Sequence, residues 1–181
     1  MPYDPPPELA SMSLAEIANL AANRKLPPLD RWSPTKIGNS HMRIAADGKW
    51  YHDGGEITRP AMVRAFSALL MCDEGGKHWL VTPHERLSID VDDAAFQAVD
   101  LKQEGGAIAF RLNTDELIVA GREHPIEAEG DTNTPALYVV VRHGTRARLN
   151  RSTYAQLAEL AIAGGDLSVS SNGETFTLVP Q

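Results

Sequence analysis

Two segments of the sequence begin in the same way: ITRPAMVRAFSALL occupies residues 57–70, and LNRSTYAQLAELA occupies residues 149–161. In each segment a residue that can cap a helix, Thr58 or Asn150, is followed by an arginine, and apolar residues then recur at helical spacing. Pro60 suits the first turn of a helix, because that turn does not need its missing N–H. The two segments therefore predict one amphipathic helix each, started by the same pattern.

Short strands are expected on both sides of each helix. Asp47-Gly48 favours a tight hairpin because both residues tolerate positive φ, and His143-Gly144 turns the chain before the second helix. The expected strands are residues 42–46, 49–52, 56–57 and 78–83 around the first helix, and residues 136–142, 145–149, 167–170 and 175–179 around the second. The shared order of hairpin, helix and hairpin predicts an internal duplication.

The rest of the chain completes an α+β fold. Ser13 and Glu16 have the spacing of a capping box, so a short helix is expected to follow Ser13. Residues 29–40 are expected to be irregular, residues 87–91, 96–102, 107–112 and 117–120 to form an antiparallel meander, and residues 127–134 to form a surface loop. We predict two structurally related small domains, mainly antiparallel sheet with one principal helix per copy. The expected domains are residues 1–84, with a frayed tail at 1–12, and residues 85–181.

Composition excludes several classes of protein. The chain has 181 residues, 43% of them hydrophobic and 23% charged, and no apolar run long enough to cross a bilayer. Its first residues lack the features of a secretory signal, and the single cysteine, Cys72, rules out an intramolecular disulfide, so a cytoplasmic location is expected. The formal charge of −7 argues against a general nucleic-acid binder, whose phosphate contacts need a basic surface.

Arg59 and Arg151 are the first candidate binding residues. Each is expected at the start of a helix, where partial positive charge and unpaired N–H groups make a cation unfavourable on its own. One hypothesis is that a phosphate or carboxylate ligand compensates, held by the guanidinium and the helix amides. The alternative is an internal salt bridge to a carboxylate such as Glu56 or Glu85.

A second candidate is the basic run before the second helix. Arg142, His143, Arg146, Arg148 and Arg151 fall within ten residues of an otherwise acidic chain. Arg146 and Arg148 have the same parity, so on a strand they face the same way. The run is typical either of a focused positive patch or of an edge strand protected by charge.

Aromatic and polar residues near the arginines are further candidates. Trp50 and Tyr154 could stack on a flat ligand, although aromatic residues in such elements are usually part of the core. His52 is expected on the same strand face as Trp50. Thr82 and Glu85 follow the last strand of the first unit and could orient the arginines.

Enzyme and metal motifs are missing from the sequence. Residues 75–78, GGKH, lack the spacing of a P-loop, and neither a dinucleotide-binding fingerprint nor a nucleophile elbow occurs. His78 and His84 have no third ligand near them in the sequence, and the neighbours of Cys72 would not stabilise a thiolate. We therefore expect no catalytic residue, no metal site and no cofactor.

Residues 47–52 (DGKWYH), residues 80–85 (LVTPHE) and the later run that includes Arg142, Arg148, Arg151 and Tyr154 also carry a family resemblance. From about Arg43 to Ala161 the chain resembles a bacterial domain-of-unknown-function family, number 1285. The resemblance implies a duplicated α+β fold with a pleckstrin-homology-like second domain. It also implies a ligand site between the domains, a nucleotide-like ligand and a role in signal transduction.

The leading hypothesis is a non-enzymatic regulatory module that binds a small anionic or nucleotide-like ligand at the interface of its two domains. The candidate ligand-binding residues are Arg59, Arg142, Arg148, Arg151, Tyr154, Trp50, His52, Thr82 and Glu85. A second hypothesis is an adaptor whose arginine patch docks an acidic signalling partner, and a third is a hydrolase that uses His52 and Glu85. Neither nucleic acid nor membrane insertion is expected, and the sequence does not fix the oligomeric state.

Overall fold

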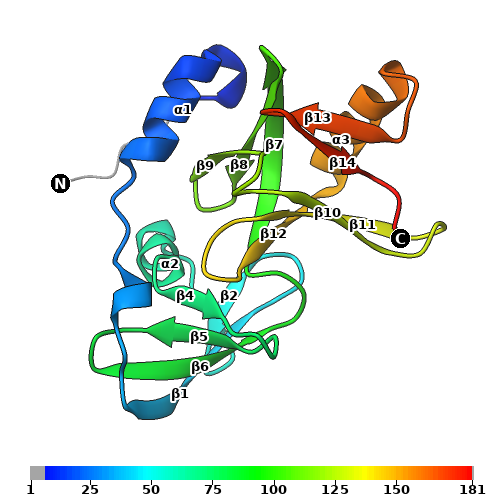
Figure 1. Cartoon of the computed structure of the whole chain (residues 1–181). Coiled ribbons are helices and arrows are strands. Elements are labelled where there is room, and N and C mark those ends of the chain that lie inside the picture. Colours follow the sequence, from blue (N-terminus) through cyan, green and yellow to red (C-terminus); the bar gives the residue numbers. More distant parts are fainter. Residues whose placement is uncertain (1–6, 181) are drawn as a thin grey trace. The chain divides into compact units, whose positions relative to one another are not determined.

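The computed structural model describes residues 7–180, which form two units. The N-terminal unit consists of Lys25–Phe96 together with the short loop Arg142–Thr145. The C-terminal unit consists of the chain up to Arg24, Gln97–Val141 and the chain from Arg146 onward. Each unit is built on one six-stranded sheet, so the expected α+β architecture of two related domains is confirmed (Figure 1).

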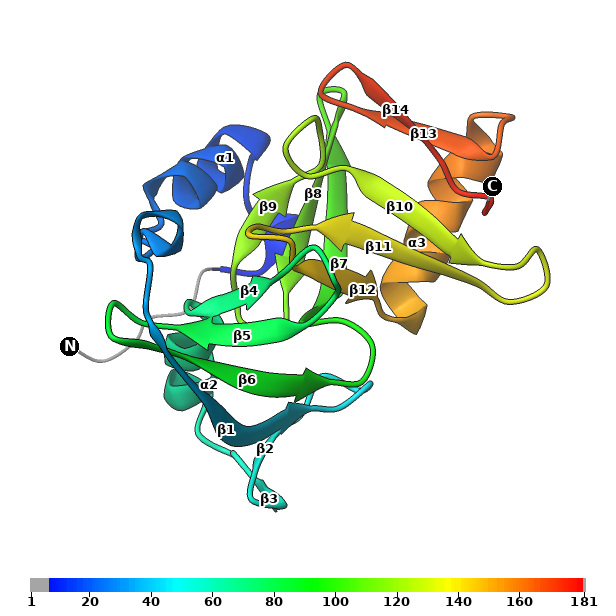
Figure 2. The same ribbon diagram turned by 60° about the horizontal axis from the view of Figure 1, so that its bottom comes forward.

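The sheet of the N-terminal unit has the strand order β3-β2-β1-β6-β5-β4. Its two central strands, β1 and β6, run parallel, and the other strands pair antiparallel. Helix α2 packs against one face of this sheet (Figure 2). There Phe66 stacks on the buried ring of Trp50 at a centroid distance of 6.4 Å. The elements of this unit are η2 (Leu29–Arg31), β1 (Lys36–Ile44), β2 (Trp50–His52), β3 (Gly55–Glu56), α2 (Pro60–Ser67), β4 (Leu70–Cys72), β5 (His78–Val81) and β6 (Glu85–Val91).

Strand β1 is longer than expected, and its pairing with β6 places the end of the first unit later in the chain than predicted. Residues 36–40 were predicted to be irregular, but they pair with β6 from Lys36↔Glu85 onward. Strand β6 in turn pairs with β5, as at Leu80↔Leu87, so it belongs to this sheet and not to a meander of the second unit. The boundary expected after residue 84 would fall between two paired strands, and the unit continues to Phe96.

The sheet of the C-terminal unit has the strand order β10-β11-β12-β7-β8-β9. The first half of the segment predicted as a loop at 127–134 is strand β10, which is held by antiparallel pairing with β11. Only the turn after β10 remains, and there Asp131 accepts the amides of Asn133 and Thr134, both at 2.8 Å. The elements are β7 (Phe96–Glu104), β8 (Ala107–Leu112), β9 (Leu117–Val119), β10 (Ile126–Gly130), β11 (Pro135–Val140), β12 (Arg146–Leu149), α3 (Arg151–Ala163), β13 (Ser168–Ser171) and β14 (Glu174–Thr177).

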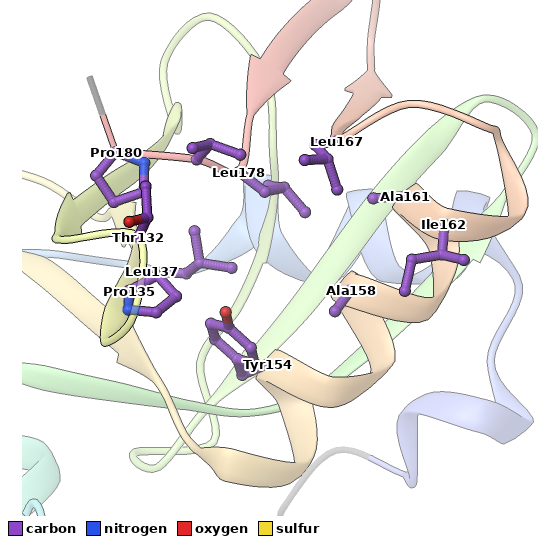
Figure 3. Close-up of a pocket in the computed structure, with 11 residues that line it drawn as sticks. Thr132, Pro135, Leu137, Tyr154, Ala158, Ala161, Ile162, Leu167, Leu178 and Pro180 are labelled. Carbon is purple, nitrogen blue, oxygen red and sulfur yellow. The ribbon is translucent and has the colours of Figure 1, made fainter.

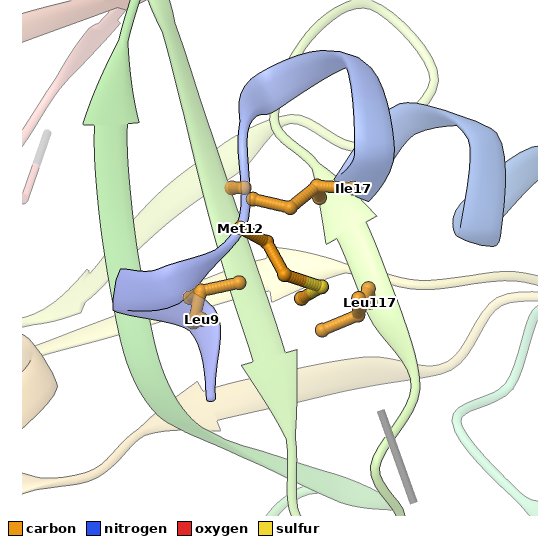
Figure 4. Packing of buried hydrophobic residues seen from close by; sticks show 5 residues of the cluster. Leu9, Met12, Ile17 and Leu117 are labelled. Carbon is orange, nitrogen blue, oxygen red and sulfur yellow. The ribbon is translucent and has the colours of Figure 1, made fainter. Parts of the chain in front are cut away.

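The first helices belong to the C-terminal unit, which the sequence did not predict. A short 3-10 turn, η1 (Leu9–Ser11), leads into α1 (Leu14–Asn23), and Ser13 caps α1 by accepting the amide of Glu16 at 3.2 Å. Leu9, Met12 and Ile17 are almost completely buried and pack with Ala109 and Leu117 of the sheet (Figure 4). The predicted frayed tail at 1–12 is therefore wrong from Leu9 onward, and residues 1–6 lie outside the described part of the chain.

The two principal helices start differently, although the sequence suggested one shared pattern. Asn150 caps α3 by accepting the amide of Thr153 at 2.9 Å, and Arg151 is the first helical residue. Arg59 itself is the N-cap of α2 and makes no side-chain cap, so Thr58 is not the capping residue. The reason is Pro60, which disfavours helical torsion angles in the residue before it and fixes the helix start at its own position.

The pH dependence of the N-terminal unit offers a first test of this fold. The indole N–H of Trp79 donates to Asp73 at 3.0 Å, and this bond, followed by the amide of Lys77, lowers the pKa of Asp73. A carboxyl group whose pKa is lowered by folding stabilises the folded state at pH values above its unfolded-state pKa of about 4. This stabilisation is lost as the pH falls through the lower pKa of the folded state. We expect Trp79→Phe to raise the pKa of Asp73, measured by carboxyl NMR, and to move acid unfolding to higher pH. Asp30→Asn, at an exposed carboxylate of the same unit, should change neither; an unaltered Asp73 pKa in Trp79→Phe would contradict the assignment.

Candidate functional site

A polar cleft lies beside the start of α2 in the N-terminal unit. Its volume is about 350 Å³. The hairpin β2–β3 supplies one side and the first turn of α2 the other, because the chain passes from Glu56 to Pro60 in three residues. The residues that line it are His52, Gly55, Glu56, Ile57, Thr58, Arg59 and Met62. Two of the predicted site residues, His52 and Arg59, therefore share one cleft.

Arg59 is the principal cation of this cleft. Its side chain is exposed and, among the residues that the structure describes, makes no hydrogen bond or ion pair. Within the same range, the amides of Thr58, Arg59 and Ala61 also have no hydrogen-bond acceptor. The internal carboxylates suggested as partners of Arg59 are engaged elsewhere: Glu56 pairs with Lys49 at 3.8 Å and Glu85 with Lys36 at 3.5 Å. The start of α2 thus presents several unsatisfied donors to the cleft.

His52 adds an imidazole to the lining of the cleft. It is exposed at the end of β2, and its Nε2 lies 3.5 Å from the carboxylate of Asp53. The cleft then contains the Arg59 guanidinium, which has no carboxylate partner in the described residues, an imidazole beside the Asp53 carboxylate, and a Glu56 carboxylate that pairs with Lys49. This balance favours a small anion over a cation.

Trp50 lies in the core and does not line the cleft. Its side chain is 2% exposed and stacks on Phe66, so the prediction that it offers a flat face to a ligand is wrong, and the core alternative holds. The alternation of side chains along a strand put Trp50 and His52 on one face. However, β2 is only three residues long, and it ends at His52, whose side chain is exposed. Burial therefore changes from one residue to the other along the same face.

Thr82 and Glu85 stabilise the turn between β5 and β6. The Thr82 hydroxyl accepts the amides of Glu85 at 3.1 Å and His84 at 3.3 Å and donates to the Glu85 carbonyl at 3.1 Å. Neither side chain contacts an arginine in the described part of the chain. The expectation that they orient the arginines is therefore not met.

Arg142 is a structural residue of the N-terminal unit. Its guanidinium donates to the Ser67 carbonyl at 3.3 Å and lies 5.3 Å from the ring centroid of Phe96. The loop that carries it is fastened to β4 by the Cys72 amide, which donates to His143 at 2.9 Å. Gly144 is needed in this loop, because its φ is 76° and a Cβ would overlap the Cys72 carbonyl.

The arginines of β12 are partly neutralised within the C-terminal unit. Arg146 forms ion pairs with Glu129 at 2.5 Å and Glu127 at 3.3 Å, and its guanidinium lies 3.9 Å from the centroid of Tyr138. The hydrogen bonds with Glu129 raise the pKa of Arg146 above its already high usual value. Arg148 lies over the same ring at 5.9 Å, in agreement with the shared parity. The two glutamates come from β10. Because β12 lies between β11 and β7 inside the sheet, the alternative of an edge strand protected by charge is wrong.

Arg151 and Tyr154 lie on α3 and belong to the C-terminal unit, whereas the polar cleft is formed by residues of the N-terminal unit. Arg151 is exposed and, in residues 7–180, has no side-chain partner, whereas Tyr154 lines an apolar groove. The nine candidate residues therefore fall into two units: Trp50, His52, Arg59, Thr82, Glu85 and Arg142 in one, and Arg148, Arg151 and Tyr154 in the other. Among the described residues no group of His, Cys, Asp and Glu could hold a metal ion, and no helix is both long and apolar enough to span a bilayer.

Sequence reasoning missed four residues that line the cleft: Gly55, Ile57, Met62 and Thr58, which was expected only as a helix cap. A usable signal was present in the short spacing of the elements. Strand β3 pairs with β2, and only three residues separate β3 from α2, so this connection stays close to the end of β2. Every residue between His52 and Met62 is therefore a candidate for the lining.

Comparisons with known proteins agree with this division of the chain. Family profiles match residues 27–94 as the N-terminal domain of a domain of unknown function, DUF1285, and residues 95–178 as the C-terminal domain of that family. A solved structure of a DUF1285 family protein from Silicibacter pomeroyi DSS-3 is 36% identical, with a TM-score of 0.78, and the match covers 92% of this chain and 94% of that one.

A DUF1285 family structure from Shewanella baltica OS155 is 20% identical with a TM-score of 0.54, covering 65% of this chain and 90% of that one, which shows similarity of fold alone. The comparison with curated proteins gave no match.

Proposed function

The chain belongs to the DUF1285 family, whose function is unknown, and from the geometry of its own cleft we propose that it is a non-enzymatic regulatory module for a small anionic ligand. The proposal rests on the surroundings of Arg59. This exposed guanidinium lines a cleft of about 350 Å³, and it has no hydrogen-bond or ion-pair partner among the described residues. A cation at a helix N-terminus is unfavourable unless an anion compensates it.

Phosphate or carboxylate oxygens fit the donors of this cleft. The guanidinium of Arg59 can bind two oxygens at once, and the amide of Ala61 in the first turn of α2, which is free within the described residues, can bind a third. The Thr58 hydroxyl adds a neutral donor, and Ile57 and Met62 can contact an apolar part of the ligand. We therefore place a phosphorylated metabolite, with a nucleotide as one member of that class, ahead of a bare inorganic ion.

Calorimetric titration with inorganic phosphate, pyrophosphate and adenosine monophosphate tests the proposal. We expect Arg59→Gln to weaken binding of the preferred anion about tenfold or more, because a hydrogen bond to a charged group contributes about 1.5–3 kcal/mol. Arg31→Gln removes the same charge from an exposed site of the same unit and should leave the affinity unchanged. Equal weakening in both variants would indicate only general electrostatic attraction, and the absence of binding by all three anions would count against the cleft as an anion site.

A further inference from the structure

An apolar groove runs along α3 in the C-terminal unit (Figure 3). Its volume is about 280 Å³, and the turn between β10 and β11 and the stretch after β14 close its other sides. Leu137, Ala161 and Leu178 form a buried floor. Ile162 and Leu167 stand at the rim with 70% and 57% of their surfaces exposed. A groove with such a floor and rim gains stability when apolar surface covers it.

The lining limits what the body of a ligand can be. Among the described residues, the polar side chains of the lining are those of Thr132 and Tyr154, and small residues, Ala158 and Ala161, face the groove from α3. A ligand rich in hydrogen-bonding groups would leave them unpaired there, which is costly. An aliphatic chain loses no hydrogen bond on entering, and the volume restricts it to a medium length.

A positive charge lies at the Tyr154 end of the groove. Arg151 precedes Tyr154 by three positions on α3, so both lie on the same side of the helix. Arg151 is exposed and without a side-chain partner within the described range. Asp131, in the turn that closes the groove, accepts the amides of its own turn, and Asp166 lies beyond the other end of α3. The cation beside the groove is therefore available to an external carboxylate.

We propose that this groove binds a medium-chain aliphatic carboxylate, with the tail between α3 and Leu178 and the carboxylate at Arg151 and the Tyr154 hydroxyl. The site is separate from the cleft at Arg59 and does not depend on the function proposed for that cleft. Charge complementarity selects a carboxylate over a neutral chain, and the apolar lining selects an aliphatic tail over a polar one.

The experiment is a calorimetric titration of the full chain with octanoate and with the neutral alcohol of the same chain length. We expect saturable binding of one octanoate, with the negative heat-capacity change of apolar burial. Arg151→Gln should weaken octanoate at least tenfold and leave the alcohol unaffected. Ala158→Phe fills the groove and should weaken both ligands at least tenfold. If Ala158→Phe does not fold, Ile162→Asp tests the same groove from an exposed position.

Two controls separate the proposal from general effects. Arg122→Gln removes a charge from another exposed site of the same unit and should leave octanoate binding at the groove unchanged. The proposal is overturned if octanoate does not bind at millimolar concentration, if Arg151→Gln and Arg122→Gln weaken it equally, or if filling the groove has no effect.

Discussion

Trp50→Ala is expected to destabilise the N-terminal unit by about 3–5 kcal/mol, the usual cost of truncating a large buried aromatic residue. Trp50 is 2% exposed and stacks on Phe66, so the truncation leaves a cavity between β2 and α2. Urea denaturation followed by tryptophan fluorescence can measure this. The chain has three tryptophans, Trp32, Trp50 and Trp79, and all of them lie in the N-terminal unit, so the remaining two report on that unit alone.

Trp50→Phe is the matched control for this prediction. The indole N–H of Trp50 is buried and has no hydrogen-bond partner in the described residues, so phenylalanine keeps an aromatic ring against Phe66 and removes an unsatisfied donor. We expect it to cost less than about 1.5 kcal/mol, as for other shape-preserving replacements. If Trp50→Ala were as stable as wild type while ligand binding was lost, Trp50 would be a binding residue as the sequence suggested, and its assignment to the core would fail.

Features set by neighbouring residues could be predicted from the sequence. The capping of α1 by Ser13, a hairpin that contains Asp47-Gly48 and the start of α3 at Asn150 each depend on a few consecutive residues, and all three occur. The turn of the hairpin differs from the expected one, because Gly48 has positive φ and Asp47 does not. The resemblance to the DUF1285 family is likewise confirmed by the profile matches. Local signals were sufficient here because the side chain and the backbone groups that it satisfies lie within one turn.

Features set by distant pairing could not be predicted in this way. Strand β1 reads as irregular because its first residues are polar, and only the parallel pairing of Lys36 with Glu85 makes it a strand. The same limit applies to Arg146 on β12. Its carboxylate partners lie on β10, and β11 is between these two strands. A local pattern gave the parity of the arginines correctly but not the strand that neutralises one of them.

The candidate site shows the same distinction. His52 and Arg59 share a cleft because only one short hairpin strand separates them, which a local pattern can indicate. Trp50 was ambiguous because period-two alternation gives two faces and does not say which one a helix will cover. Grouping Arg59 with Arg151 relied on a similarity of helix starts, and the structure assigns them to different units.

The second large effect is expected at the N-terminal arm, residues 9–23. Ile17 is 0% exposed and packs with Leu9, Met12 and Leu117 in the C-terminal unit. Polar contacts hold the same segment in place, because the Leu14 amide donates to Glu104 at 2.8 Å and the Lys102 ammonium donates to the Met12 carbonyl. Although this arm precedes both family-matched ranges, which begin at residue 27, it supplies part of the core of the C-terminal unit.

Ile17→Asp is therefore expected to destabilise the C-terminal unit by more than about 4 kcal/mol, because it removes a core side chain and places an unpaired carboxylate in its position. Leu20→Asp is the matched control on the same helix: Leu20 is 45% exposed, and its replacement should change stability by less than about 0.5 kcal/mol. Hydrogen exchange resolved along the chain would show faster exchange in β8 and β9 of Ile17→Asp, with β1 and β6 less affected. Equal protection of β8 and β9 in the two variants would mean that the arm does not contribute to that core.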